Sequence, residues 1–517
     1  MPIINSILSW WMKKRIHQIE LFMKYPHEVQ RDWLTRLIDS AMYTEWGVKY
    51  DYHSIQTLED FKKRVPIQNY DTLKPFIQRL MNGEQNILWP SDVKWFAKSS
   101  GTTADKSKFI PVTAEAIEEC HFKGGKDLLS IYCNNHPETQ IFTGKGLILG
   151  GSTSSLAQSS DQTSLFGGER GLGDISAVLM QNLPLWVQLI RTPDLSIALM
   201  EKWEEKIEKM VRATIPENVT NISGVPTWTL VLAKQVLEVT GKKNLLEVWP
   251  NLELFVHGAV SFTPYEEQFH RLFPSPSFNY LETYNASEGF FGIQDQSKSE
   301  EMLLMLDYGV FYEFMPMEEY GKEDPKTLNL EEVELNKNYT LIISTNAGLW
   351  RYLIGDTIKF TSLNPFRIKI SGRTKHFINA FGEEVIVENS DQAIKIACDK
   401  TDSLIKEYTV APIYFSSTEN GAHEWLIEFE KPPANIDYFT EVLDNALKSL
   451  NSDYEAKRYK DMALRLPVLR EMPPGTFYNW LKSKDKLGGQ YKVPRLSNNR
   501  KYVDEIKEVL RKMTVRN

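Results

Sequence analysis

The segment FAKSSGTTADKSKFIPV, residues 96–112, contains the residue types that bind phosphate groups. A glycine stands among four hydroxyl side chains, and lysine follows: Ser99, Ser100, Gly101, Thr102, Thr103 and Lys108. Glycine exposes backbone N–H groups, and the hydroxyls and the ammonium group supply further hydrogen-bond donors for a triphosphate. A Ser/Thr-rich surface turn with solvated lysines has the same composition, so this segment alone leaves both interpretations open.

The segment YLETYNASEGFFG, residues 280–292, places polar residues after an apolar, strand-like stretch. Tyr284 offers a ring that can stack on a purine, Ser287 a hydroxyl for a phosphate oxygen, and Glu288 a carboxylate for a magnesium ion that bridges phosphates. The letters NASEG also nearly fit the G-x-S-x-G elbow of hydrolases, but Asn285 occupies the first glycine position. The elbow interpretation is therefore the weaker of the two.

The segment STNAGLWRYLIGDTIKF, residues 344–360, begins with the end of a predicted strand at Thr345. Asp356 carries a carboxylate that can accept both hydroxyl groups of a ribose. The alternative is a β-hairpin in which Gly355 and Asp356 mark the turn and Arg351 forms a salt bridge.

Two further segments carry cations next to glycines. In KISGRTKHFINAFGEEV, residues 369–385, Gly372 permits backbone rotation and Arg373 supplies a guanidinium. Near the end of the chain, GGQYKVPRL places Lys492 between Gly489 and Pro494. Taken alone, such a lysine is a solvated charge.

In this order, the segments resemble those of the adenylate-forming superfamily, and more closely the acyl-acid amido synthetase family of plants and bacteria. SSGTTADKSKFIP is similar to the first nucleotide motif of that family, YNASE to the second and NAGLWRYLIGD to the third, while QYKVPR resembles its C-terminal lysine segment. The resemblance spans essentially the whole chain. It implies an enzyme that uses ATP and Mg²⁺ to convert a carboxylic acid into acyl-AMP and then joins the acyl group to an amino acid, releasing AMP.

The resemblance also implies a role for each of these residues. The phosphate ligands are Ser99, Ser100, Gly101, Thr102, Thr103 and Lys108. The adenosine ligands are Gly258 and Ala259 through their backbone, Tyr284 at adenine, Asp356 at ribose and Arg373 beside the hinge. The catalytic set is Lys492, Ser287 at the α-phosphate and Glu288, which also holds the metal. We interpret His257 as a buried histidine at a strand end rather than as a general base.

The elements that position these residues follow an α/β pattern. The first hundred residues have helical spacing of apolar side chains, as in HEVQRDWLTRLIDSAM, and Thr113 is suited to cap a helix after the phosphate-type loop. The middle alternates LELFVHGAV, YEEQFHRLF, FNYLETY and NYTLIIST, which is typical of a sheet flanked by helices. We expect a large N-terminal ATP- and acyl-acid-binding domain over residues 1–370 and a small, mobile α+β C-terminal domain over residues 371–517, joined by a hinge.

Composition excludes several other classes. The net charge of −8 argues against a nucleic-acid partner, and the three dispersed cysteines indicate a reducing, cytoplasmic location without structural zinc. The apolar N-terminal run ends at Lys13, which is too soon to span a bilayer. This run has two interpretations. One is a helix that lies on a membrane, with Trp10 and Trp11 inserted and Lys13, Lys14 and Arg15 at the headgroups. The other, which we favour, is a helix that packs on its own domain.

Two alternatives to the amido synthetase keep part of this chemistry. An acyl-CoA ligase would use the same adenylation step with a thiol as acceptor, and a non-catalytic nucleotide-binding protein would bind ATP without turnover. The expected partners are a small carboxylic acid and an amino acid, with no nucleic acid and no membrane span.

Overall fold

The computed structural model describes residues 2–99, 108–155, 171–259, 262–373, 377–378, 380, 383, 385–414, 421–458, 464–484, 492–497 and 499–514. The chain divides into two compact units. Unit 1 contains residues 1–259, 273–354 and 358–369, and unit 2 contains residues 260–272, 355–357 and 370–517. Unit 2 thus also draws on two short segments from the middle of the chain.

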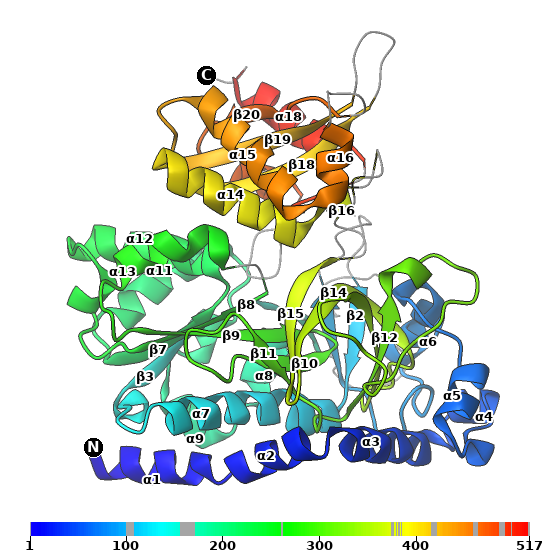
Figure 1. The fold of residues 1–517 in the computed structure, drawn as a ribbon. Helices are drawn as coiled ribbons and strands as arrows, with labels where there is room; N and C mark the ends of the chain where they lie inside the picture. Colours follow the sequence, from blue (N-terminus) through cyan, green and yellow to red (C-terminus); the bar gives the residue numbers. More distant parts are fainter. Residues whose placement is uncertain are drawn as a thin grey trace. The chain divides into compact units, whose positions relative to one another are not determined.

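Unit 1 begins with helices, as the apolar spacing predicts. They are α1 (Pro2–Lys13), α2 (Ile16–Lys24), α3 (Pro26–Ala41), α4 (Glu45–Lys49), α5 (Leu58–Arg64) and α6 (Tyr70–Met81). In Figure 1, α1, α2 and α3 follow one another along one side of unit 1. The side-chain amide of Gln30 on α3 donates to the carbonyls of Leu306 and Val310 and accepts from the N–H of Tyr312, which fixes the helix against the strands.

The main sheet has eleven strands in the order β12-β13-β14-β15-β11-β10-β9-β8-β7-β3-β6. The strands are β3 (Lys145–Leu149), β6 (Arg191–Thr192), β7 (Val219–Gly224), β8 (Leu254–Gly258), β9 (Asn279–Ala286), β10 (Gly289–Ile293), β11 (Met302–Leu304), β12 (Val310–Pro316), β13 (Asn338–Thr345), β14 (Tyr352–Leu363) and β15 (Phe366–Arg373). From β6 to β9 all neighbouring strands are parallel, so their carboxyl ends meet at one edge. Ligands collect at such edges in α/β proteins.

Further helices lie in the connections between the strands. Those of unit 1 are α7 (Lys123–Asn135), α8 (Ile175–Asn182), α9 (Leu185–Leu189), α10 (Leu195–Ala198), α11 (Trp203–Thr214) and α12 (Pro226–Thr240), whereas α13 (Glu266–Leu272), between β8 and β9, belongs to unit 2. Thr113 caps the helical segment that leads through a π-helical stretch (Ala116–Phe122) into α7, because its Oγ1 accepts from the N–H of Ala116. This cap was predicted from the sequence.

A second, four-stranded sheet in unit 1 has the order β2-β1-β5-β4. Its strands are β1 (Trp95–Ser99), β2 (Lys108–Val112), β4 (Thr153–Ser155) and β5 (Gly171–Gly173). Strands β1 and β2 are antiparallel, and β1 and β5 are parallel.

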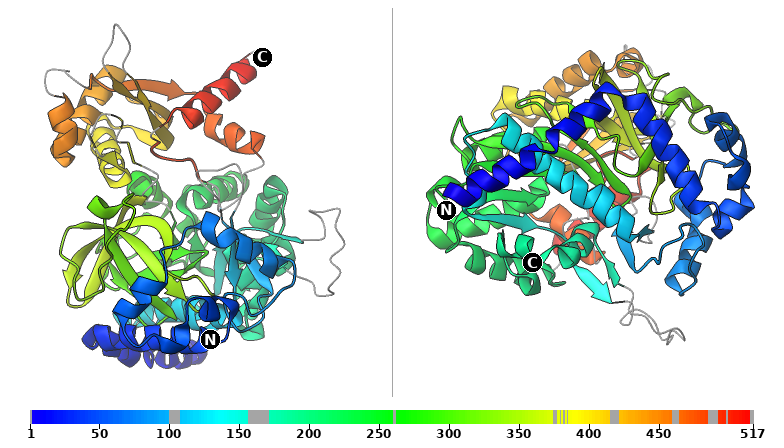
Figure 2. Two further views of the ribbon diagram at one scale, coloured as in Figure 1. Left: turned by 90° about the vertical axis from the view of Figure 1, so that its right-hand side faces the viewer. Right: turned by 90° about the horizontal axis from the view of Figure 1, so that it is seen from below.

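Figure 2 shows α1 to α3 and the neighbouring α7 from below.

Unit 2 has its own cores. Strands β18 (Leu404–Ile413), β19 (Ala422–Lys431) and β20 (Val468–Met472) form a sheet in that order, and β16 (Phe377–Ile378) pairs with β17 (Val385–Ile386). Its helices after residue 370 are α14 (Val387–Thr401), α15 (Ile436–Leu450), α16 (Ser452–Arg458), α17 (Thr476–Ser483) and α18 (Lys501–Thr514). One core joins this sheet to α14 and α15, and a second lies between the sheet, α17 and α18.

The predicted α/β class is confirmed. Helices α10 and α11 are separated by a break, because α10 ends at Ala198 and α11 begins at Trp203. The hairpin turn predicted at Gly355–Asp356 is wrong, because both residues lie inside β14, and the change of direction occurs between Thr345 and Tyr352. Within the described residues, no helix combines the length and the apolar character needed to cross a bilayer.

Candidate functional site

The phosphate-type loop lies between two paired strands. Ser99 ends β1 and Lys108 begins β2, and these residues are register partners across the antiparallel pair. The N–H of Phe109 donates to the hydroxyl of Tyr70 at 2.9 Å, and the Lys108 ammonium lies 5.7 Å from the centroid of the same ring. Four predicted phosphate ligands, Ser100, Gly101, Thr102 and Thr103, lie outside the described residues.

A buried polar cluster stands beside the carboxyl end of β1. Register pairs Ala97 with Gly173 of β5, and Asp174 follows directly. The Asp174 carboxylate accepts from the N–H of Ser152 at 3.0 Å, and the Lys206 ammonium donates to the carbonyls of Gly150 and Gly151 at 2.7 and 2.8 Å. A Cβ at Gly151 would lie 1.6 Å from an Asp174 oxygen, so the turn requires glycine.

Burial shifts both charged groups of this cluster toward neutrality. It raises the pKa of Asp174 to about 6, against the lowering effect of the Ser152 N–H, Lys206 and Lys98, and it lowers the pKa of Lys206 to about 8. Sequence reasoning did not single out Asp174 or Lys206. The glycine-rich stretches around residues 150 and 171 were the only sequence feature that marked this cluster. Lys206 is distant from both stretches in the sequence, so no local pattern connected it to them.

The parallel strands β8 and β9 bring the predicted adenine ligands together. Gly258 is paired with Thr283, and a Cβ at Gly258 would lie 2.4 Å from the Thr283 carbonyl oxygen. Ala259 follows with a φ of +71°, in the left-handed region that non-glycine residues rarely adopt. The end of β8 therefore presents its backbone at the level of Tyr284 on β9.

Tyr284 is buried, and its ring contacts that of Phe291 edge to face at 5.0 Å between centroids. Ser287 and Glu288 form the turn between β9 and β10, closed by the pair Ala286 and Gly289. Both turn residues are half-buried. Five predicted site residues, Gly258, Ala259, Tyr284, Ser287 and Glu288, thus gather at the carboxyl ends of β8 and β9.

The donors in this group fit a magnesium ion that is carried largely by phosphates. Mg²⁺ is commonly held by one or two carboxylates together with substrate phosphates and water. Over the described part of the chain, no group of three or more His, Cys, Asp or Glu side chains is arranged to hold a metal ion. Glu288 supplies one carboxylate at the turn, which suits a magnesium ion coordinated mainly by phosphates and water rather than one coordinated entirely by protein ligands.

His257 lies on β8, one residue before Gly258. Burial lowers the pKa of His257 to about 3, so the ring is neutral near pH 7. The ring lies 5.4 Å from that of Phe255, and the His257 carbonyl accepts from the hydroxyl of Thr283. These contacts support the interpretation of His257 as a buried strand residue.

The remaining predicted ligands belong to unit 2. Asp356 is buried inside β14, next to Thr357, whose hydroxyl contacts that of Ser371 at 3.1 Å. Arg373 ends β15, after Gly372 with a φ of +153°. Lys492 is half-buried and lies outside the helices and strands.

The residues that follow Lys492 are fixed to β18. The carbonyl of Pro494 accepts from the Thr409 hydroxyl, and the carbonyl of Arg495 accepts from the N–H of Val410 at 2.8 Å. The Arg495 guanidinium donates to Glu407 and to the hydroxyl of Tyr265. Arg495, which sequence reasoning did not single out, thus anchors the lysine segment within unit 2.

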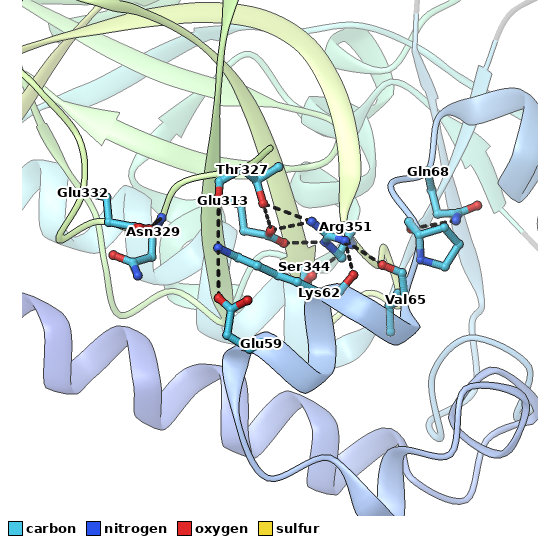
Figure 3. A network of polar contacts seen from close by, with 11 residues as sticks. Glu59, Lys62, Val65, Gln68, Glu313, Thr327, Asn329, Glu332, Ser344 and Arg351 are labelled. Carbon is cyan, nitrogen blue, oxygen red and sulfur yellow. Dashed lines mark hydrogen bonds and ion pairs between the residues drawn. The ribbon is translucent and has the colours of Figure 1, made fainter. Parts of the chain in front are cut away.

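Arg351 stands at the start of the strand that carries Asp356, and Figure 3 shows its surroundings. Its guanidinium donates to Glu313, to the hydroxyl of Thr327 and to the carbonyls of Lys62 and Val65. The salt bridge proposed for Arg351 from the sequence is therefore confirmed, with Glu313 as its partner.

Family models match most of the chain. Residues 15–278 match the model of the GH3 family N-terminal domain, residues 303–373 the GH3 family central domain and residues 388–501 the GH3 family C-terminal domain. The N-terminal match alone covers more than half of the 517 residues.

Curated relatives and solved structures agree with these matches. The chain is 24% identical to indole-3-acetic acid-amido synthetase GH3.3 of Arabidopsis thaliana, over 93% of this chain and 91% of the relative. Its fold is similar to that of the acyl acid amido synthetase AtGH3.15 in complex with 2,4-DB, with a TM-score of 0.78, 16% identity and 96% of both chains covered. It is also similar to that of a 2-hydroxyisobutyryl-CoA ligase in complex with 2-HIB-AMP, with a TM-score of 0.60, 12% identity and coverage of 94% and 91%.

Proposed function

The chain belongs to the GH3 family, and we propose that it is an acyl-acid amido synthetase that activates a carboxylic acid with ATP and transfers the acyl group to an amino acid. The products are an amide, AMP and pyrophosphate. The names of the curated GH3.3 relative and of the AtGH3.15 structure support this assignment. The two-step chemistry suits a carboxylate, because a free carboxylate is a poor electrophile and AMP is a good leaving group.

The observation that carries the proposal is the grouping of Gly258, Ala259, Tyr284, Ser287 and Glu288 at the carboxyl ends of β8 and β9. The backbone at the end of β8, where Gly258 is buried and Ala259 exposed, suits the edge of a purine, and an aromatic ring such as that of Tyr284 suits its face. The hydroxyl of Ser287 and the carboxylate of Glu288 stand at the next turn, where the phosphates of the same nucleotide would lie. Few functions need this combination at a single sheet edge.

In the first step, a carboxylate oxygen of the acid attacks the α-phosphorus of ATP, and the bond to pyrophosphate breaks. Ser287 donates to an α-phosphate oxygen, while Ser99, Ser100, Gly101, Thr102, Thr103 and Lys108 hold the β- and γ-phosphates. Donors aimed at the charge that develops on pyrophosphate stabilise the transition state more than the substrate. Glu288 holds Mg²⁺, which neutralises phosphate charge when bound.

Unit 2 contributes the other proposed ligands. Asp356 accepts hydrogen bonds from the ribose hydroxyls, Arg373 assists at the end of β15, and Lys492 stabilises the adenylation transition state. In the second step the amine of the amino acid attacks the acyl carbonyl, the bond to AMP breaks, and the amine loses a proton. We place a hinge at Gly372, between a domain of residues 1–370 and one of residues 371–517, which would expose acyl-AMP to the amine.

We also propose a cytoplasmic location, since Cys120, Cys133 and Cys398 are free thiols. An acyl-CoA ligase is the second candidate function, because the fold is also similar to that of the 2-hydroxyisobutyryl-CoA ligase. The two functions share adenylation and differ in the acceptor. Identifying the product, an amide or a thioester, therefore distinguishes the amido synthetase from the acyl-CoA ligase.

The test is pyrophosphate release from ATP and Mg²⁺ with a panel of carboxylic acids, with and without mixed amino acids or CoA. Lys492→Ala is expected to lower acid-dependent release by about a hundredfold or more, and Glu288→Gln to raise the Mg²⁺ requirement. The matched controls are Lys512→Ala and Glu208→Gln, since both residues form exposed helical ion pairs. Amide products support the proposal, and thioester products assign the ligase. ATP binding without release for any acid overturns both functions in favour of a non-catalytic nucleotide-binding protein.

A further inference from the structure

Helix α1 packs on the rest of unit 1 through one side and leaves several large apolar residues exposed on the other. The Asn5 amide donates to the Thr139 carbonyl at 2.8 Å and accepts from the N–H of Phe142 at 3.1 Å, and Ser9 and Met12 are also buried. In contrast, Ile7 is 57% exposed, Trp10 61% and Trp11 40%. A helix held only for its own domain would bury most of its large apolar residues, whereas α1 buries Met12 and leaves these three exposed.

Helix α9 extends the same apolar surface. Leu185, Trp186 and Leu189 are 81%, 45% and 77% exposed, and the helix contains no buried residue. The rings of Trp11 and Trp186 contact each other edge to face, with 6.4 Å between centroids. Figure 1 shows α9 next to α1 in unit 1. We call Ile7, Trp10, Trp11, Leu185, Trp186 and Leu189 the tryptophan surface.

The charges at the tryptophan surface are positive. The Lys14 ammonium lies 3.8 Å from the centroid of the Trp10 ring, and the Lys126 ammonium lies 4.3 Å from that of Trp11. Lys13 ends α1, and neither α1 nor α9 contains an Asp or Glu. Arg15 does not belong to this set, because it forms an ion pair with the buried Asp127 at 2.6 Å. The membrane-helix alternative weighed from the sequence placed Arg15 at the headgroups, and this ion pair shows that Arg15 packs within unit 1 instead.

We propose that the tryptophan surface binds the surface of an anionic lipid bilayer. Exposed tryptophans and leucines suit the boundary between headgroups and acyl chains, and lysines beside them suit anionic headgroups. The positive charge, without an acid on either helix, is complementary to such a membrane. The Lys14 and Lys126 stems can lie along the tryptophan rings while their ammonium groups reach the headgroups. The proposal is independent of the adenylation chemistry.

Sedimentation of the full chain with lipid vesicles tests the proposal. We expect binding to vesicles of phosphatidylcholine with about a third phosphatidylglycerol, and at least about tenfold weaker binding to pure phosphatidylcholine. Trp10→Ser combined with Trp186→Ser is expected to weaken binding to the anionic vesicles by about tenfold or more. The matched control is Tyr43→Ser, because Tyr43 is 76% exposed and lies between α3 and α4.

Reversing the lysine charges separates the electrostatic contribution to vesicle binding from the contribution of the apolar side chains. Lys14→Glu combined with Lys126→Glu is expected to weaken binding by at least about 25-fold at low salt, and the difference should shrink as salt is added. Acid-dependent pyrophosphate release and the unfolding midpoint should stay unchanged in every variant, which shows that the fold is intact. No binding by the intact chain, or equal binding to neutral and anionic vesicles, overturns the proposal. Loss of a dimer in Trp10→Ser, without vesicle binding by the parent, would instead assign the surface to a second copy.

Discussion

Arg351 and Glu313 form a buried, two-pronged ion pair. The Arg351 Nε donates to Glu313 Oε2 at 2.9 Å and Nη2 donates to Oε1 at 2.8 Å, and both side chains are almost fully buried. Arg351 has a φ of +43°, and its N–H donates to the Ser344 hydroxyl. The pair therefore sets how the chain turns from β13 into β14, the strand that carries Asp356.

Arg351→Met is expected to lower the free energy of unfolding by about 3–5 kcal/mol, because it leaves the Glu313 carboxylate buried without its charge partner. Urea unfolding measures this change. Arg212→Met is the control, since Arg212 pairs with Glu208 on an exposed face of α11, and it should cost at most about 0.5 kcal/mol. Equal losses in the two variants would show that the buried pair has no special part in stability.

Gly258→Ala is expected to weaken ATP binding and to lower the free energy of unfolding by about 1–3 kcal/mol, because the new methyl group would meet the Thr283 carbonyl and push β8 from β9. Isothermal titration and urea unfolding measure the two effects. Gly125→Ala is the control: Gly125 lies on α7 with open space around its Cβ position. It should stabilise the chain by about 0.5–1 kcal/mol. Unchanged ATP binding in Gly258→Ala would contradict a purine site at this strand end.

Two buried histidines make stability depend on pH. Burial lowers the pKa of His257 to about 3 and that of His121 to about 4, from an ordinary value of 6.5. The folded state thus keeps both rings neutral, while the unfolded state takes up protons below pH 6.5. Stability is fully present above that pH and falls as the pH drops toward 4, by about 1 kcal/mol per pH unit for each histidine.

Urea unfolding at pH 7 and pH 5 checks this dependence. His257→Gln should reduce the loss of stability between the two pH values, because the group that binds the proton in the unfolded state is gone. His17→Gln should leave the loss unchanged, since His17 is largely exposed on α2. The same loss in the parent and in His257→Gln would refute the assignment.

Arg495 is expected to position Lys492 without touching substrate. Its guanidinium contacts Glu407, Tyr265 and the face of the Tyr408 ring, with 4.4 Å to the ring centroid. We expect Arg495→Met to lower kcat for acid-dependent pyrophosphate release about tenfold or more, while KM for ATP stays within about twofold. Arg495→Lys should restore part of kcat. A rise in KM with an unchanged kcat would contradict a positioning role.

Much of the secondary structure could be predicted because it follows local patterns. HEVQRDWLTRLIDSAM predicts a helix that the structure places at Pro26–Ala41, and NYTLIIST corresponds to β13. The break between α10 and α11 could not be predicted from periodicity. Helix α11 is held by the Lys206 ammonium, which reaches two carbonyls in a distant turn, and such long-range contacts leave no local pattern.

The same limit applies to the site and to the division of the chain. The ligands at β8 and β9 follow their strands directly in sequence, so the strand pattern located them. Asp174, Lys206 and Arg495 act on segments far from their own position. Likewise, Gln268 joins unit 2 because its amide donates to the Ile405 carbonyl and to Glu430. No change of composition marks that contact.

The Arg351 network has a consequence for how related sequences vary. Two of its hydrogen bonds end on the backbone carbonyls of residues 62 and 65, which every amino acid provides. The bonds to Glu313 and Thr327 instead end on side chains. Among homologues, covariation with position 351 should therefore appear at positions 313 and 327, and be absent at 62 and 65 although these residues lie equally close.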